Sequence, residues 1–287
     1  MRRLFCFGLG YCALALIERL GGRGLTVAGT CQSEDKRQAF AERGIETYRF
    51  ARAAPLPGRA LMGTTHLLSS IAPDADGDPV IDRHFFDLAR LEGLEWVGYL
   101  SSTSVYGDRE GAWVDESIEP DPGTARGKRR LEAERRWLDL WQGFAVPVHV
   151  FRLAGIYGPG RSAVDDVRSG RARRVVKPGH YFSRIHVADI AACLEASIAR
   201  PHPGAIYNVS DDLPESSDRV VSFASSLLGR EPPPAIPYDE AELSEMSRSF
   251  YLENRRIANR RMKEELGVTL AFPDYRAGLR AIADAEF

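Results

Sequence analysis

The chain has few cysteines, few histidines and no excess of charge of either sign. Four cysteines are scattered among 287 residues without the spacing of metal ligands, which argues against a disulfide scaffold and is typical of a reducing compartment. The net charge is −2, so we expect no overall attraction to nucleic acid or to an anionic membrane. The six histidines also lack metal-ligand spacing, and we therefore predict no metal site.

Long hydrophobic runs are also missing. No stretch reaches the ~18 apolar residues that a membrane-spanning helix needs. Arg2 and Arg3, followed by apolar residues, resemble the start of a secretory signal, but the run ends at Glu18 without a small-x-small cleavage site. We therefore expect a cytoplasmic protein without a membrane or nucleic-acid partner.

The start of the chain does carry a glycine turn between an apolar run and a helix-favouring segment. Gly8, Gly10 and Ala13 form the pattern G-x-G-x-x-A, with Tyr11 at the start of the expected helix. Gly8 permits a tight turn, Gly10 lets the backbone approach a pyrophosphate, and Ala13 allows close packing of helix and strand. The N–H groups at the positive helix end would then face the anion, which predicts a dinucleotide site.

Short apolar runs alternate with longer helix-favouring segments along the chain. Expected strands cover Leu4–Phe7, Leu25–Thr30, Thr65–Ser70, Trp96–Leu100, Val146–Leu153 and Ala205–Val209. Expected helices cover Glu34–Arg43, Asp82–Glu92, Lys128–Trp141, Ile185–Ile198, Arg219–Leu228 and Arg255–Leu266. This alternation predicts an α/β fold, a doubly wound parallel Rossmann sheet covered on both faces, with a smaller C-terminal substrate lobe. We expect residues 1–158 to form the dinucleotide-binding domain, to which 184–210 return, and 211–287 with 159–183 to form the lobe.

Five strings follow one another at regular intervals. They are the glycine turn at 8–13, Ser-Ser-Thr-Ser-Val-Tyr-Gly-Asp at 101–108, Arg-Leu-Ala-Gly-Ile-Tyr-Gly-Pro-Gly-Arg at 152–161, Arg-Ile-His-Val-Ala-Asp-Ile-Ala at 184–191, and Tyr-Asn-Val-Ser-Asp-Asp at 207–212. Together they resemble the extended or atypical short-chain dehydrogenase/reductase superfamily, in its NAD-dependent epimerase/dehydratase family.

The resemblance implies that a Ser or Thr, a Tyr and a Lys carry hydride and proton transfer. It assigns the hydroxyl to Ser102, with Thr103 beside it, and the lysine to Lys128, which would also bind the nicotinamide ribose. Thr124 occupies the position of the tyrosine. A threonine hydroxyl is a far weaker acid than a phenol of pKa ~10, so it would not serve as the same proton shuttle near neutral pH.

Three outcomes of this substitution stay open. Another acid, Tyr106, Tyr157 or Tyr181, would reach the site; Ser102, Thr124 and water would act with reduced efficiency; or the chain would bind a dinucleotide without turnover. Two hydroxyl residues, Thr103 and Ser104, stand where the dehydratases of the family resemble one another in having Asp-Glu. We therefore do not expect a 4,6-dehydratase.

The residues after the second expected strand bear on NAD against NADP. An acidic residue there would bind the ribose 2′-hydroxyl and select NAD, but the first carboxylate is Glu34. Gln32, Ser33 and Arg37 could instead face a 2′-phosphate, which favours NADP; equally, Glu34 to Arg37 could be a solvated helix turn. We expect Ser69 and Ser70 to line the cofactor groove.

The remaining candidates concern the substrate. The expected substrate contacts are Tyr106, Arg161, Arg184 and His186, although Arg184 could equally bind Asp189 or a carbonyl oxygen. The favoured hypothesis is an NAD(P)-dependent oxidoreductase or epimerase acting on a sugar-nucleotide-like or other small hydroxyl or carbonyl substrate. The alternative is a catalytically degenerate NAD(P)-binding sensor. The resemblance also implies a homodimer.

Overall fold

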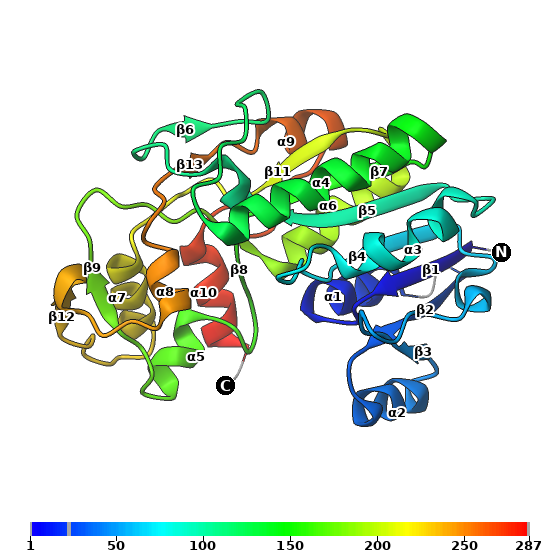
Figure 1. The fold of residues 1–287 in the computed structure, drawn as a ribbon. Helices are drawn as coiled ribbons and strands as arrows, with labels where there is room; N and C mark the ends of the chain where they lie inside the picture. Colours follow the sequence, from blue (N-terminus) through cyan, green and yellow to red (C-terminus); the bar gives the residue numbers. More distant parts are fainter. Residues whose placement is uncertain (1, 22–23, 286–287) are drawn as a thin grey trace. The chain divides into compact units, whose positions relative to one another are not determined.

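A seven-stranded sheet dominates the computed structural model, which describes residues 2–21 and 24–285 (Figure 1). Its strand order is β11-β7-β5-β4-β1-β2-β3. Neighbouring strands pair in parallel from β5 through β4, β1 and β2 to β3. The strands are β1 (Arg2–Phe7), β2 (Leu25–Cys31), β3 (Glu46–Arg49), β4 (His66–Ser69), β5 (Trp96–Ser102), β7 (Val148–Leu153) and β11 (Ile206–Val209). This confirms the predicted doubly wound sheet, whose order reverses between β1 and β4.

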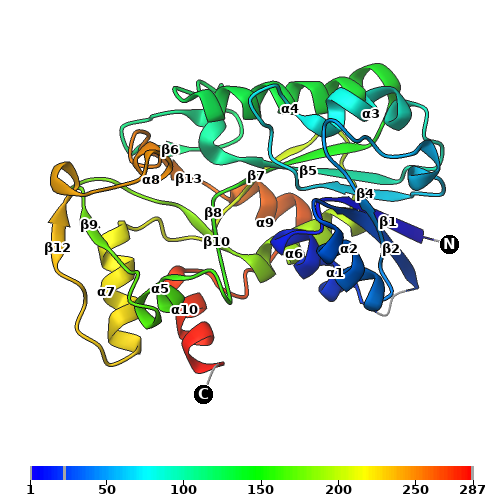
Figure 2. The same ribbon diagram turned by 60° about the horizontal axis from the view of Figure 1, so that its bottom comes forward.

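Helices cover both faces of this sheet. They are α1 (Tyr11–Leu20), α2 (Glu34–Glu42), α3 (Pro79–Ala89), α4 (Ala125–Phe144) and α6 (Val187–Ala199), with a 3-10 turn η1 at Gly58–Leu61. Figure 2 shows α3 and α4 on one face and α1 on the other. Arg19 of α1 and Glu195 of α6 form an ion pair at 2.5 Å, which joins these two helices.

The chain divides into two compact units. Unit 1 takes the described residues of Met1–Ser102, Ala125–Arg152 and Ala191–Tyr207, and unit 2 those of Thr103–Thr124, Leu153–Ile190 and Asn208–Phe287. The outermost residues of the two predicted lobes, 1 and 286–287, lie outside the described part. The division into a dinucleotide-binding domain and a substrate lobe, with boundaries at 158 and 211, stays a prediction.

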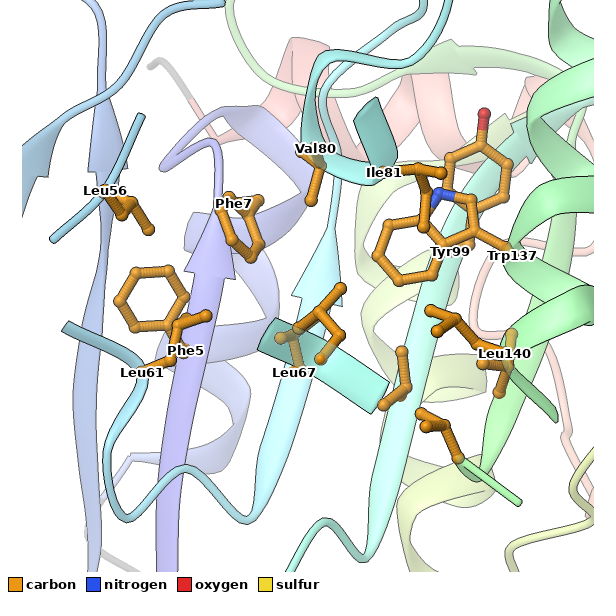
Figure 3. Close-up of a cluster of buried hydrophobic side chains, with 14 of the residues drawn as sticks. Phe5, Phe7, Leu56, Leu61, Leu67, Val80, Ile81, Tyr99, Trp137 and Leu140 are labelled. Carbon is orange, nitrogen blue, oxygen red and sulfur yellow. The ribbon is translucent and has the colours of Figure 1, made fainter. Parts of the chain in front are cut away.

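The main core of unit 1 lies between the sheet and the pair α3 and α4. Figure 3 shows Phe5 and Phe7 of β1 beside Leu67 of β4, and Tyr99 of β5 beside Trp137 of α4. All five side chains are fully buried. Continuous apolar strands are expected where helices cover both faces of a parallel sheet.

Unit 2 is built from shorter elements. They are η2 (Thr103–Tyr106), β6 (Trp113–Val114), β8 (Gly155–Tyr157), α5 (Ala163–Arg168), β9 (Arg174–Val176), β10 (Arg184–His186), α7 (Ser217–Leu227), β12 (Ala235–Pro237), η3 (Tyr238–Glu240), α8 (Glu245–Ser249), β13 (Arg256–Ile257), α9 (Arg260–Leu266) and α10 (Tyr275–Asp284). The strands form three pairs, β10 with β8, β12 with β9 and β13 with β6. A separate core packs α5, α7 and α10 around Tyr157.

Two predicted helices begin later than expected, because strands occupy their first residues. His186 belongs to β10, which pairs with Gly155–Tyr157, and α6 starts only at Val187. Arg256–Ile257 form β13 against β6, and α9 starts at Arg260. A third helix begins earlier than predicted, since Asp78 caps α3 by accepting from the N–H groups of Val80 and Ile81.

Candidate functional site

The predicted glycine turn has the geometry that its sequence requires. Gly8 has φ +89°, and a Cβ there would lie 2.8 Å from Ser70 Oγ, so a larger residue would be strained. The Gly8 N–H donates to Thr30 Oγ1 at 2.8 Å, and Ser70 Oγ donates to the Gly8 carbonyl at 2.8 Å. The ends of β2 and β4 therefore fix the turn that follows β1.

The N-terminus of α1 is open. A Cβ on Gly10 would meet no heavy atom of the described residues within 4 Å. Among those residues, no side chain caps this end and the first turn, which begins at Tyr11, carries no acidic group. Ala13 is buried, as close packing of helix and strand requires. A helix N-terminus without a side-chain cap or an acidic first turn, approached over a glycine, fits a diphosphate because the positive end of the helix faces the anion.

The end of β2 contains one positioning feature that the sequence reasoning missed. A Cβ on Gly29 would lie 2.7 Å from the Cys6 carbonyl oxygen and 2.8 Å from Leu9 Cγ, so Gly29 lets the glycine turn approach β2. A glycine inside a strand pattern is the signal that could have identified it.

The candidate residues for a 2′-phosphate lie just beyond β2. Gln32 and Ser33 are exposed, and the Ser33 side chain caps α2 by accepting from the Lys36 N–H. Arg37 forms an ion pair with Glu34, and its Nε donates to Glu34 Oε1 at 2.8 Å. This pairing matches the solvated helix turn that the sequence left open, and it offsets the charge of the first carboxylate after the strand.

The two serines at the end of β4 differ in environment. Ser70 is half-buried and makes the bond to Gly8 described above. Ser69 is fully buried, and its hydroxyl has no hydrogen-bond partner among the described residues. Their expected role in lining a cofactor groove stays a prediction.

A buried charge network, missed in the sequence, lies at the end of β5. Ser101 donates to Glu134 of α4, and Arg152 of β7 binds both oxygens of that carboxylate, with Nη2 to Oε2 at 2.8 Å. Arg130 Nη1 donates to the Leu100 carbonyl at 3.0 Å. Both Arg130 and Glu134 are buried, although charged residues of a helix are ordinarily exposed.

The predicted catalytic residues are divided between the two units. Ser102, half-buried, and Lys128, exposed on α4, belong to unit 1. Thr103 and Thr124 belong to unit 2, where Thr103 is buried and Thr124 is half-buried. Their assignment to catalysis stays a prediction.

In unit 2, a buried ion pair holds the Thr124 backbone. The Thr124 N–H donates to Glu253 Oε1 at 3.3 Å, and Glu253 Oε2 lies 3.0 Å from Arg255 Nη1. The same Arg255 nitrogen donates to the Gly107 carbonyl at 2.9 Å. Residues 253–256, here called the strap, thus connect the segment after η2 with Thr124.

The tyrosines considered as replacement acids differ in their bonds. Tyr106 is fully buried, and its hydroxyl donates to Asn208 Oδ1 at 2.8 Å. The Tyr157 hydroxyl donates to the Asp274 carbonyl at 3.3 Å, and burial raises its pKa. Tyr181 is half-buried, with the Arg256 guanidinium 5.0 Å from its ring centroid. The engaged hydroxyls of Tyr106 and Tyr157 favour packing roles.

The other substrate candidates also make internal contacts. Arg184 Nη1 donates to the carbonyls of Phe182 and Glu215, both at 2.8 Å, which is the carbonyl-binding alternative left open above. His186 is buried against Phe272, and burial lowers its pKa to about 4. Arg161 is exposed, beside a tight backbone bridge to Gly158.

Two further searches cover the described residues only. In that part of the chain, no group of three or more His, Cys, Asp or Glu residues is placed to hold a metal ion. Nor does any helix there have the length and apolar character needed to cross a membrane.

Sheet order, glycine turn and uncapped helix end together define a Rossmann fold, as the motifs predicted. UDP-glucuronic acid 4-epimerase from Bacillus cereus, solved in complex with NAD, shares this fold with a TM-score of 0.77 at 15% identity, over 99% of this chain and 98% of that one. No family model matches the chain.

Two proteins of higher sequence identity have no stated activity. A conserved protein from Silicibacter pomeroyi DSS, described as functionally unknown, is 47% identical with a TM-score of 0.92, over 99% of both chains. Protein YeeZ from Escherichia coli K12 is 28% identical over 96% of this chain and 97% of its own length. The chain belongs to the family of the Silicibacter protein.

Proposed function

We propose that the chain is an NAD(P)-dependent oxidoreductase or epimerase acting on a sugar-nucleotide-like or other small hydroxyl or carbonyl substrate. The observation that carries the proposal is the glycine turn of unit 1. Gly8 is held by Thr30, and α1 follows Gly10 without a side-chain cap among the described residues. The fold of NAD-bound epimerases supports the same assignment.

Each residue has a proposed part in the reaction. The amides at the start of α1 would bind the diphosphate, and the dinucleotide, when bound, would supply hydride transfer. Ser102 would donate a hydrogen bond to the substrate oxygen, with Thr103 beside it. Lys128 would bind the nicotinamide ribose, and Thr124 with water would serve where the family has a tyrosine.

NADP is the proposed preference. No carboxylate directly follows β2, and the first one, Glu34, has its charge offset by Arg37. Repulsion of a 2′-phosphate is therefore weak at this edge of the sheet.

A catalytically silent NAD(P) sensor is the second candidate. One observation favours it: Thr124 stands at the position that the resemblance assigns to the tyrosine, and its hydroxyl is a far weaker acid than a phenol. Both candidates require cofactor binding, and only the first requires turnover.

Titration of the protein with NADPH and NADH, followed by nicotinamide fluorescence, tests the common requirement. We expect binding of both, tighter for NADPH. Gly10→Glu should abolish binding without unfolding the chain, because a Cβ at Gly10 meets no described atom while a carboxylate there repels the diphosphate. Gly58→Glu, at another exposed glycine with open space around it, is the matched control.

The two candidates separate in a turnover assay. Aldehydes and ketones are screened for loss of nicotinamide absorbance with the same protein, and sugar nucleotides for an epimeric product by NMR, because an epimerase regenerates its coenzyme in each turnover. Turnover of any of them supports the enzyme, whereas tight binding with no turnover supports the sensor. A wild-type protein that binds neither coenzyme would contradict both.

A further inference from the structure

The buried face of α4 changes character along its length. Near the end of β5 it carries the charged residues Arg130 and Glu134, and further along it carries Trp137 and Leu140. Trp137 stacks on Tyr99 at 5.5 Å between ring centroids, within the core described above. Charged groups on this face are therefore restricted to the end at which β5 terminates.

These charged groups bind consecutive residues of β5. Arg130 Nη1 donates to the Tyr99 hydroxyl at 3.1 Å and to the Leu100 carbonyl at 3.0 Å. Glu134 accepts from the Ser101 hydroxyl and is itself held by two nitrogens of Arg152. Directional polar bonds thus fix the contact between the first turns of α4 and the end of β5.

Burial of these charged groups carries a large desolvation free energy. The side chains of Glu134 and Arg152 are 2% and 3% exposed. Desolvating an ion pair costs about as much as its attraction returns, and apolar side chains of similar volume often give equal or greater stability. We therefore expect the network to fix the position of the strand end more than to raise the free energy of unfolding.

Strand alternation indicates what this geometry controls. Side chains of a strand point to opposite faces in turn, so Ser101 faces α4 with Tyr99, and Ser102 faces away from it. Ser101 is 4% exposed and committed to Glu134, whereas Ser102 is half-buried. Ser101 therefore fastens the strand to α4, whereas Ser102 lies at the strand end on the opposite face.

We propose that Glu134, held by Arg152, is a positioning residue that fixes the end of β5 beneath the nicotinamide half of the cofactor and sets the direction of Ser102. This inference rests on the proposed cofactor binding. In a sheet of this order the adenosine half lies toward β2 and the diphosphate at the β1–α1 turn, which leaves β4 and β5 for the nicotinamide half. Displacing the end of β5 would then weaken binding of the nicotinamide half and leave binding of the adenosine and diphosphate portion unchanged.

Glu134→Gln tests the proposal, with Glu132→Gln, an exposed residue of the same helix, as the matched control. Each variant is titrated with NADH and, separately, with ADP, which carries only the adenosine and diphosphate portion. We expect Glu134→Gln to bind NADH about tenfold more weakly and ADP unchanged, since a charged hydrogen-bond network of this kind is lost. The emission of bound NADH should also shift, because it reports the surroundings of the nicotinamide ring.

Other outcomes overturn the proposal in distinguishable ways. Equal weakening of NADH and ADP would make Glu134 a purely structural residue, and affinities equal to those of Glu132→Gln would remove its role altogether. A wild-type protein that binds neither ligand would refute the proposed function itself. Ser101→Ala, which leaves the Glu134–Arg152 pair intact, repeats the test if Glu134→Gln does not fold, and the same loss confined to NADH is expected.

Discussion

Units 1 and 2 are stabilised internally by different kinds of contact. In unit 1, long buried strands and two helices share one apolar core, with a buried charge network at the end of β5. In unit 2, strands of two or three residues are fastened by side chains that bind backbone groups. Unit 1 is thus specified by a repeating pattern, and unit 2 by individual bonds.

The strap of unit 2 is held by several bonds from one residue, Asn254. The Asn254 carbonyl accepts from the N–H groups of Arg109 and Gly111, at 2.9 and 3.0 Å. Its side-chain oxygen accepts from the Tyr181 N–H at 2.9 Å, and its amide nitrogen donates to the Gly179 carbonyl at 2.9 Å. One short segment therefore orders several loops, and a change within it can alter them together.

The largest expected effect contrasts a buried tryptophan of unit 1 with an exposed one of unit 2. Trp137 is fully buried and its Nε1 donates to Asp78 Oδ2 at 3.0 Å, whereas Trp113 is 51% exposed. We expect Trp137→Ala to lower the free energy of unfolding by roughly 3–5 kcal/mol, through the cavity and the loss of the hydrogen bond to Asp78 Oδ2. Trp113→Ala should cost less than about 1 kcal/mol. Urea unfolding followed by circular dichroism measures both, and similar losses would refute the contrast.

A smaller effect is expected from the strap. Glu253→Ala leaves Arg255 charged and largely buried without its carboxylate, which should cost roughly 2–3 kcal/mol. Hydrogen exchange should show faster exchange at the amides of Thr124, Arg109 and Gly111, with the amides of β1 unchanged. Glu231→Ala, at an exposed site, is the control. Uniform acceleration across both units would show that unit 2 does not depend on individual bonds.

The difference between the units also explains which features the sequence could predict. The glycine turn and the strand alternation are short-range patterns with fixed periods, and both the sheet and the geometry of Gly8 and Gly10 follow them. Glu134 and Arg152 lie 18 positions apart, and Glu253 is 129 positions from Thr124, so no local spacing could have identified either contact. Arg130 and Glu134 moreover occur within a helix rich in charge, where exposure is the ordinary expectation.

The smallest effect concerns a buried carboxylate of unit 2 and changes with pH. Asp211 is 1% exposed, and its Oδ2 has no hydrogen-bond partner among the described residues. Burial raises the pKa of Asp211 to about 8, against the opposing influence of Arg184 and with smaller contributions from Asp212 and Asp274. Unit 1 offers the contrast of His149, whose pKa burial lowers to about 4.

The two groups should affect stability in different pH windows. Because folded Asp211 binds a proton more tightly than the unfolded chain does, its contribution to stability falls as pH rises from about 4 to 8. His149 is neutral when folded, so its contribution falls as pH drops below about 6.5. The stability of Asp211→Asn relative to the wild type should therefore be greater at pH 9 than at pH 5. Urea unfolding at the two pH values measures this difference. If it does not change with pH, the carboxyl is already ionised in the folded protein, and the Arg184 guanidinium compensates for its burial.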